Sequence, residues 1–135
     1  MIVKRGNGQS MSYYIDYTTY FYDSALVAVN YDATERELYS TTLSNGGHYI
    51  AHIYFGDKNG VGGQTLATRL YINGTVIESQ FSDTANSFMS NQRHYKNPLF
   101  VFQCQANDTI KIVVQKTDGT NWTSVNTRIK VAQIA

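Results

Sequence analysis

The segment TLATRLYINGTVIESQF, residues 65–81, contains the clearest local structural signal in the chain. Two runs rich in β-branched and other apolar residues flank the dipeptide Asn73-Gly74. A two-residue type I′ turn requires positive φ at both central positions, and Asn-Gly adopts this conformation readily. The segment therefore predicts a β-hairpin with strands at Thr65–Ile72 and Thr75–Phe81.

Similar strand signals occur on both sides of this hairpin, and no segment shows the 3.6-residue period of an amphipathic helix. The aromatic segment Ser12–Tyr22 is expected to be either a core strand or an arm that contacts a neighbouring subunit. The polar stretch Ser82–Asn97 is expected to be a long loop with at most one short strand. Turn signals every 8–12 residues or so predict an all-β sandwich or barrel of about eight to ten strands. The other expected strands are Ala25–Tyr31, Glu37–Leu43, Tyr49–Phe55, Leu99–Gln105, Thr109–Lys116 and Arg128–Ile134.

Composition limits the class of protein. A chain of 135 residues fits a single domain; we expect residues 1–24 to form an N-terminal arm and aromatic strand and residues 25–135 the folded domain. Eleven basic and ten acidic residues leave a net charge of +1, which does not indicate a nucleic-acid partner. The short apolar runs and the polar N-terminus predict neither a membrane span nor a secretory leader. We therefore expect a soluble protein made in the cytoplasm.

The residues that most often form metal sites do not cluster in sequence. His48 and His52 lie on one face of an expected strand, roughly 13 Å apart, which is too far to share one metal ion. Asp57-Lys-Asn-Gly60 resembles the start of a calcium loop, but Thr68 stands where the bidentate glutamate belongs. No metal or other cofactor is expected.

Catalytic signals are also weak. Cys104 shares strand parity with Phe100 and Phe102, so we expect its thiol in the core, and as a lone cysteine it cannot form an intrachain disulfide. The chain has no Gly-x-Ser-x-Gly elbow. A carboxylate pair stays open as an alternative, because distant acidic residues can meet in the fold. We expect a protein that is not an enzyme.

The segment Tyr49–Phe55 alternates cleanly, so Tyr49, Ala51, Ile53 and Phe55 are expected to face the core. The alternate positions then face outward and, with Tyr71, present an aromatic surface that monomers rarely expose. Tyrosine combines contact area with a polar tip, which suits burial between subunits. The predicted subunit interface consists of Ile50, His52, Tyr54 and Tyr71.

Several of these segments together resemble the jelly-roll heads of the complement and tumour-necrosis-factor superfamily and their phage and bacterial relatives. The likeness covers the chain from about Leu43 onward and rests on GHYIAHI at 47–53, RLYINGTVI at 69–77, LFVFQCQANDTIKI at 99–112 and TRIKVAQI at 127–134. Asn107 replaces the glycine usual before the aspartate in one turn, and asparagine tolerates the left-handed conformation. The resemblance implies a jelly-roll β-sandwich that assembles as a homotrimer without a cofactor.

The resemblance implies two functions, both of them binding roles without catalysis. The first is a trimeric bacteriophage virion protein that decorates or cements the capsid, located in the virion and contacting the major capsid protein of the shell. The second is a receptor-binding head that recognises a host glycan or protein, with Tyr95 and Trp122 as candidate ligand contacts. A small enzyme on a β-scaffold is a third, weaker alternative. The residues expected to contact the capsid are those of the N-terminal arm, Lys4, Arg5, Tyr13, Tyr14 and Tyr17.

Overall fold

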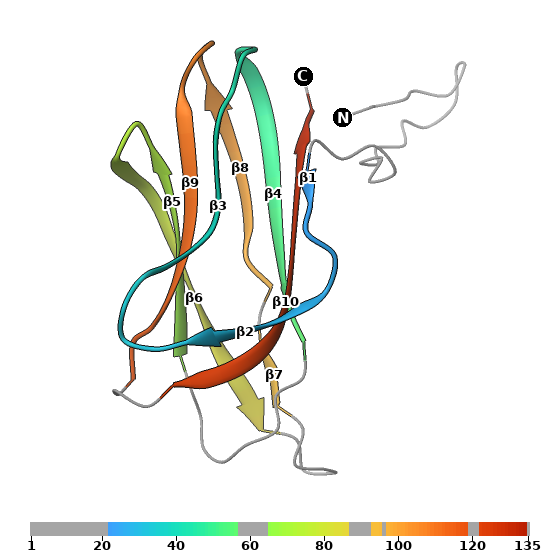
Figure 1. Ribbon diagram of the computed structural model, residues 1–135, viewed down its shortest axis with the longest axis vertical. Coiled ribbons are helices and arrows are strands. Elements are labelled where there is room, and N and C mark those ends of the chain that lie inside the picture. The colour runs from blue at the N-terminus through green and yellow to red at the C-terminus, as the bar shows by residue number, and fades with distance from the viewer. Residues whose placement is uncertain (1–21, 57–64, 87–92, 96, 119–121, 135) are drawn as a thin grey trace, which may run out of the picture.

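The computed structural model describes residues 22–56, 65–86, 93–95, 97–118 and 122–134, and for residues 83–86 and 93–95 it describes the backbone alone. Within these ranges the chain is all β (Figure 1), and no helix is long and apolar enough to cross a membrane. The strands are β1 (Tyr22–Asp23), β2 (Val27–Tyr31), β3 (Arg36–Thr42), β4 (Gly47–Phe55), β5 (Thr65–Ile72), β6 (Thr75–Asn86), β7 (Arg93–Tyr95), β8 (Leu99–Cys104), β9 (Thr109–Lys116) and β10 (Thr123–Gln133).

The strands form two antiparallel sheets that face each other. Sheet A has the order β1-β10-β4-β8, and β2 pairs with β10 at the same edge as β1. Sheet B has the order β3-β9-β5-β6-β7. Among the described residues, β8 is therefore the last strand of sheet A, and β6 has a partner strand on its outer side only where residues 84–86 pair with β7.

The pairing between distant strands is nested. Strand β2 pairs with β10, β3 with β9, β4 with β8, and β5 with the adjacent β6. A long antiparallel ribbon folded over into two sheets has this connectivity, which defines a jelly roll. The expected fold class, a jelly-roll β-sandwich, is confirmed.

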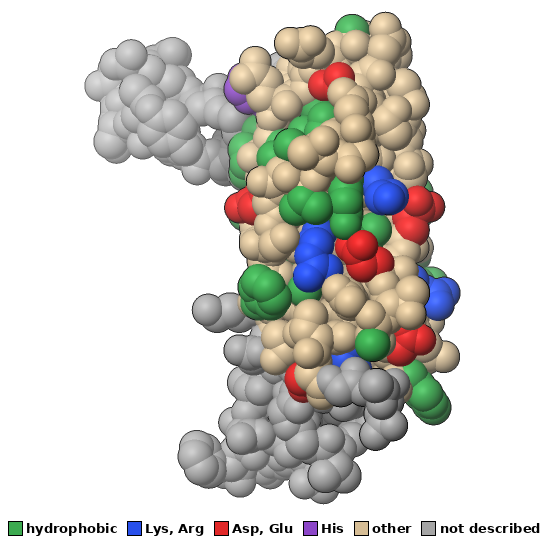
Figure 2. Space-filling model, turned by 90° about the vertical axis from the view of Figure 1, so that its left-hand side faces the viewer, with side chains coloured by type: hydrophobic (Ala, Val, Ile, Leu, Met, Phe, Trp, Pro, Cys, Tyr) green, Lys and Arg blue, Asp and Glu red, His purple; other side chains and the backbone are tan. Residues whose placement is uncertain are grey.

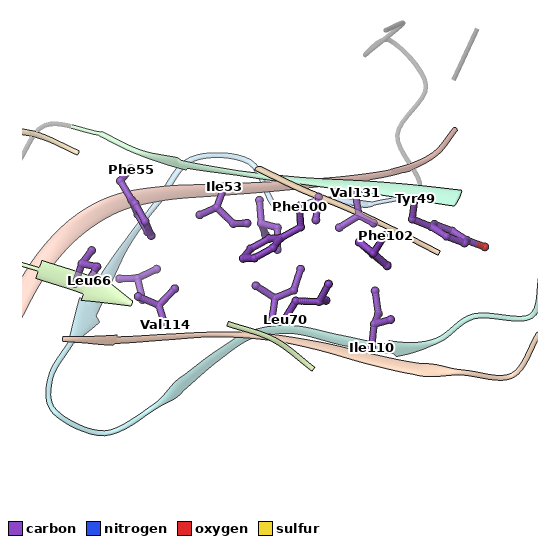
Figure 3. Close-up of a cluster of buried hydrophobic side chains, with 14 of the residues drawn as sticks. Tyr49, Ile53, Phe55, Leu66, Leu70, Phe100, Phe102, Ile110, Val114 and Val131 are labelled. Carbon is purple, nitrogen blue, oxygen red and sulfur yellow. The ribbon is translucent and has the colours of Figure 1, made fainter. Parts of the chain in front are cut away.

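The core lies between the two sheets, as Figure 3 shows for side chains that approach from above and below. Tyr49, Ala51, Ile53 and Phe55 are all buried in it, as the alternation of β4 predicted. Cys104 is buried in the same cluster. The hydroxyl groups of Tyr31 and Thr127 are hydrogen bonded at 2.7 Å, so a buried polar tip is satisfied within the core. The sequence pattern therefore identified the inner face correctly.

Two turns at one end of the sandwich have the predicted conformations. Asn73 (φ 51°) and Gly74 (φ 80°) form the turn of the β5–β6 hairpin, and Asn107 (φ 70°) takes the left-handed conformation between β8 and β9. The two turns are joined, because the Asn73 side chain donates to Asp108 Oδ1 at 2.9 Å and accepts from the Thr109 backbone N–H at 2.9 Å. The hairpin prediction and the tolerance of asparagine at position 107 are both confirmed.

The polar stretch after Phe81 contains the one short strand that the prediction allowed, but it begins with a continuation of β6 that was not expected. Strand β6 continues to Asn86, and β7 pairs with its last three residues. Strand β10 also begins at Thr123, earlier than expected, because residues 123–127 pair with β2. Backbone pairing with a distant strand satisfies hydrogen bonds whatever the side-chain polarity, so these strands carry no strong apolar signal of their own.

Candidate interaction surfaces

The outer face of sheet A carries three of the four residues predicted for a subunit interface. His52 lies between Leu99 of β8 and Lys130 of β10 in the strand register, and Tyr54 lies beside Arg128. The Tyr54 side chain is 43% exposed and that of His52 is half-buried. These two positions point outward, as the alternation predicted.

Ile50 also lies on this face, but it is not an exposed contact residue. It is only 2% exposed and forms a small apolar cluster with Ala132 and Ile134 at the end of β10. The expectation of an exposed Ile50 is therefore corrected, because residues about 80 positions away in sequence already cover this side chain within a single chain.

A hollow of about 260 Å³ opens on the same face, lined by Leu26, His52, Tyr54, Arg128 and Lys130. Leu26 and the Tyr54 ring supply its exposed apolar surface. The sequence analysis did not select Leu26, Arg128 or Lys130. The alternation of Arg128 and Lys130 with Ile129 and Val131 could have indicated two cations on one face, but their neighbours on β4 depend on the strand order.

Asp23 lies beside this hollow and binds one of its two cations, Arg128. Its carboxylate accepts from Arg128 Nε at 2.9 Å and from Arg128 Nη2 at 2.5 Å, a bidentate pair. The Arg128 hydrogen bonds, together with the Ala25 backbone N–H, lower the pKa of Asp23 to about 2. Burial, with a smaller contribution from Lys130, lowers the pKa of His52 below its usual value. Among the described residues, the hollow and its border therefore bring together two cations, the Asp23 carboxylate and an imidazole whose pKa is lowered.

The outer face of sheet B carries Tyr71, the fourth predicted interface residue, in a polar network. The Tyr71 hydroxyl donates to the Glu35 carboxylate at 2.8 and 2.9 Å, and Lys111 Nζ lies 4.6 Å from the centre of its ring. Arg69 donates to Gln115 Oε1 at 2.7 Å and reaches Glu35 at 3.5 Å. Tyr71 and Tyr54 therefore lie on opposite faces of the sandwich, and the grouping of Tyr71 with the β4 residues is corrected.

Exposed apolar side chains also lie along the side of the sandwich formed by β6 and β8. We call this set the edge surface: it comprises Val76 and Phe81 on the outer face of sheet B, Leu99 and Val101 on the outer face of sheet A, and Ile77. All five side chains are exposed, Val101 to 59%. Figure 2, which views the molecule from the side of β5 and β6, shows hydrophobic side chains gathered midway along it, beside charged groups. The edge surface was missed in sequence, although apolar residues on both faces of Leu99–Cys104 are a signal that both faces are covered.

The side chain of Gln80 connects the two strands of the edge surface. Its amide donates to the Leu99 carbonyl oxygen at 2.6 Å and its carbonyl oxygen accepts from the Leu99 N–H at 3.2 Å. Both backbone groups of Leu99 are thus satisfied by a side chain, as they would be by a neighbouring strand.

The two candidate ligand contacts, Tyr95 and Trp122, belong to different segments of the chain. Trp122 is 67% exposed at the start of β10, whereas Tyr95 belongs to β7, where only the backbone is described. The predicted capsid-contact residues Lys4, Arg5, Tyr13, Tyr14 and Tyr17 lie outside the described residues. Their roles stay predictions.

The part of the chain that the structure describes contains no group of three His, Cys, Asp or Glu side chains close enough to hold a metal ion. Cys104 is buried, and this burial raises the pKa of its thiol. A protonated, buried thiol is a poor nucleophile, so Cys104 acts as a core side chain.

Comparison with solved structures supports the fold. A chain from T=1 particles derived from infectious bursal virus superposes with a TM-score of 0.51 at 11% identity, covering 94% of this chain and 35% of that one. Two further structures have lower TM-scores. A family 35 carbohydrate-binding module from an environmental isolate has a TM-score of 0.47 at 15% identity, covering 88% of this chain and 83% of that one. The CBM36-1 domain of a multidomain xylanase from the hindgut metagenome of Trinervitermes trinervoides has a TM-score of 0.45 at 15% identity, covering 80% of this chain and 77% of that one. No protein-family model and no curated protein sequence matches the chain.

The chain is a jelly-roll sandwich. The superposition with the viral chain agrees with the nested strand pairing, and at 11% identity it shows the fold alone. This chain spans about a third of that viral chain. The likeness does not show membership of the complement and tumour-necrosis-factor superfamily.

Proposed function

We propose that this chain is a non-enzymatic structural protein of a bacteriophage virion, which assembles as a homotrimer and decorates the capsid through contacts with the major capsid protein. The observation that carries the proposal is the distribution of exposed apolar side chains. Nine large hydrophobic side chains of the described residues are exposed, and seven of them belong to the edge surface or the adjoining hollow.

Four of these seven side chains, those of Leu26, Tyr54, Leu99 and Val101, lie on the outer face of sheet A, whereas Val76 and Phe81 pair with residues on the outer face of sheet B. Leu99 of the edge surface is the register neighbour of His52 in the hollow, and Gln80 ties Leu99 to β6. Soluble monomers rarely leave a large contiguous apolar surface in water, because its burial is favourable by about 25 cal/mol per Å². A region of this kind is expected in a protein that works in contact with other protein surfaces, as in a shell.

The test is antibody-gold labelling of virus particles from the source system, read by electron microscopy. Label distributed over the heads supports the capsid role. Removal of residues 1–10 is then expected to abolish attachment to particles while preserving the oligomer, because the arm residues Lys4 and Arg5 are proposed to contact the shell. Particles without label would contradict the proposal.

A receptor-binding head is the second candidate, and the hollow favours it. An aromatic ring beside two cations can stack on a sugar and bind its acidic or hydroxyl groups. Label confined to tail tips would support this function, and a glycan array probed with the purified chain would then identify the ligand class.

A further inference from the structure

We propose that Asn45 is a site of spontaneous deamidation and main-chain rearrangement, and that hydrogen bonds protect the same dipeptide at Asn73-Gly74. The sequence Asn-Gly occurs at residues 45–46, 59–60 and 73–74, and the second of these lies outside the described residues. The other two form a matched comparison, since both asparagines are exposed and both lie between consecutive strands. This inference is independent of the virion role.

The modification consumes water alone. The main-chain nitrogen of Gly46, after losing its proton to hydroxide, attacks Cγ of Asn45. The side-chain nitrogen takes a proton from water and leaves as ammonia, so that a five-membered succinimide ring forms. Water then cleaves one of the two C–N bonds of this ring, which gives aspartate or, with the main chain rerouted through Cβ and Cγ, isoaspartate. Glycine favours ring closure because no Cβ hinders the attacking nitrogen, and both products carry a new negative charge.

The side chain of Asn45 is open to this attack. Among the described residues, neither its amide group nor the main-chain N–H of Gly46 has a hydrogen-bond partner. The main-chain carbonyl of Asn45 accepts from the Tyr49 hydroxyl at 2.6 Å. This bond holds the main chain of the residue and leaves the side-chain amide able to rotate toward the Gly46 nitrogen.

The side chain of Asn73 is held in place. Its amide donates to Asp108 Oδ1 at 2.9 Å, and its carbonyl oxygen accepts from the Thr109 N–H at 2.9 Å. The main-chain N–H of Asn73 also donates to the Thr109 carbonyl at 2.8 Å. Both side-chain bonds must break before Cγ can approach the Gly74 nitrogen, which makes the reaction slower. The hydrogen bonds that join these two turns therefore also protect Asn73.

Packing explains why the reactive dipeptide is retained at residues 45–46. The turn after β3 and the turn after β8 lie at the same end of the sandwich (Figure 1), and the Leu43 N–H donates to the Asp108 carbonyl at 2.8 Å. A Cβ at Gly46 would lie 3.2 Å from both the Ala106 nitrogen and the Cys104 carbonyl oxygen, which are main-chain atoms. A larger residue that would slow ring closure is thus disfavoured by the fold.

The test follows both sites in the full chain by peptide mapping and mass spectrometry at mildly alkaline pH, with the chain either folded or unfolded in guanidinium chloride. In the folded chain, Asn45 is expected to deamidate roughly 10- to 100-fold faster than Asn73, because two hydrogen bonds must break at Asn73. In the unfolded chain, which lacks these bonds, the two rates are expected to agree within about threefold. Mapping separates the peptides, so products at residues 59–60 do not enter the comparison.

Two variants test the cause, with circular dichroism to establish that each is folded. Asp108→Ala removes one hydrogen-bond acceptor from Asn73 and is expected to speed deamidation there roughly tenfold while leaving the rate at Asn45 unchanged. Asn45→Gln is expected to abolish the more acidic species seen by ion exchange, because its longer side chain closes a six-membered ring far more slowly. Equal rates at Asn45 and Asn73 in the folded chain, or the same ratio of rates in the folded and unfolded chains, would overturn the proposal.

Discussion

The outer side chains of sheet A and sheet B differ in how far other side chains of the same chain cover them. On sheet B, the exposed faces of β5 and β9 are covered by a network in which Glu35 accepts from Tyr71 and Arg69 donates to Gln115. On sheet A and its edge, aromatic and aliphatic side chains such as Tyr54 and Val101 stay open to water beside two cations.

This difference shows which part of the surface is complete within one chain: the part of sheet B formed by β5 and β9 is, whereas Val76 and Phe81 on the neighbouring β6 are exposed. Tyr71 and Tyr54 are the same residue type on equivalent outer positions, yet only the Tyr71 hydroxyl has a hydrogen-bond partner among the described residues. A face whose polar groups bind one another needs no second protein, whereas an exposed apolar face gains free energy when another surface covers it. The two tyrosines therefore differ in whether their hydroxyl groups have hydrogen-bond partners, and not in residue type.

The largest expected effect comes from a matched pair on β8. Phe100 is fully buried between the sheets and Val101, the next residue, is 59% exposed. Phe100→Ala is expected to lower the free energy of unfolding by about 3–5 kcal/mol, since it removes a large side chain from a packed core. Val101→Ala is expected to change it by less than about 0.5 kcal/mol under conditions where the chain is monomeric. Urea denaturation of both variants tests this, and equal losses would mean that Val101 is covered within one chain.

The next largest effect is expected when the hydroxyl group is removed from each of the two tyrosines, Tyr71 and Tyr54. Tyr71→Phe removes the hydrogen bond to Glu35 and is expected to lower the free energy of unfolding by about 0.5–1 kcal/mol, a value kept small because the pair is exposed. Tyr54→Phe is expected to leave it unchanged. The tyrosine titration of wild type gives a second measurement, because the hydrogen bond to Glu35 raises the pKa of Tyr71 and the variant lacks this group. Equal stability of the two variants would show that the sheet B network contributes nothing.

The smallest expected effect is the loss of stability at acid pH that comes from the Asp23–Arg128 pair on sheet A. Arg128 holds the pKa of Asp23 near 2, below its unfolded value of about 4. The pair therefore stabilises the fold above about pH 4, and this contribution is lost as the pH falls from about 4 to about 2. The Asp23→Asn variant is expected to show a smaller change in its urea unfolding midpoint than wild type when the pH is lowered across this range. Some dependence is expected to remain, since hydrogen bonds from Asn73 and Gln105 also lower the pKa of Asp108. An unchanged pH profile would argue against the bidentate pair.

Features that depend on neighbouring residues could be predicted from the sequence. The alternation of Tyr49–Phe55 identified the inner face of β4, and the dipeptide Asn73-Gly74 identified its turn. Asn107 was recognised as a tolerated left-handed residue. Each of these follows from side-chain period or local backbone preference, which act over a few residues.

Features that depend on strand order could not be predicted. Ile50 has the correct parity for an outward residue, but Ala132 and Ile134 of the far strand cover it. Tyr71 was grouped with Tyr54 because both were expected to point outward, and no periodicity states which sheet a strand joins. The extension of β6 to Asn86 lies in a polar stretch and depends on backbone pairing with β7 and β5. The hollow combines residues from β4 and β10 with Leu26, so its charges become visible only when the register is known.

The nested strand pairing also determines when the fold can form. Val27 of β2 pairs with Thr127 of β10, a separation of a hundred residues along the chain. During synthesis, β2 and β3 have no partner strands until β10 and β9 have left the ribosome, whereas the β5–β6 hairpin can close early. Folding is therefore expected to be slow, with the hairpin at residues 65–81 as the first ordered element. Nascent chains would meanwhile expose the strands of their future core, so protection by chaperones is expected to matter for the yield of this protein.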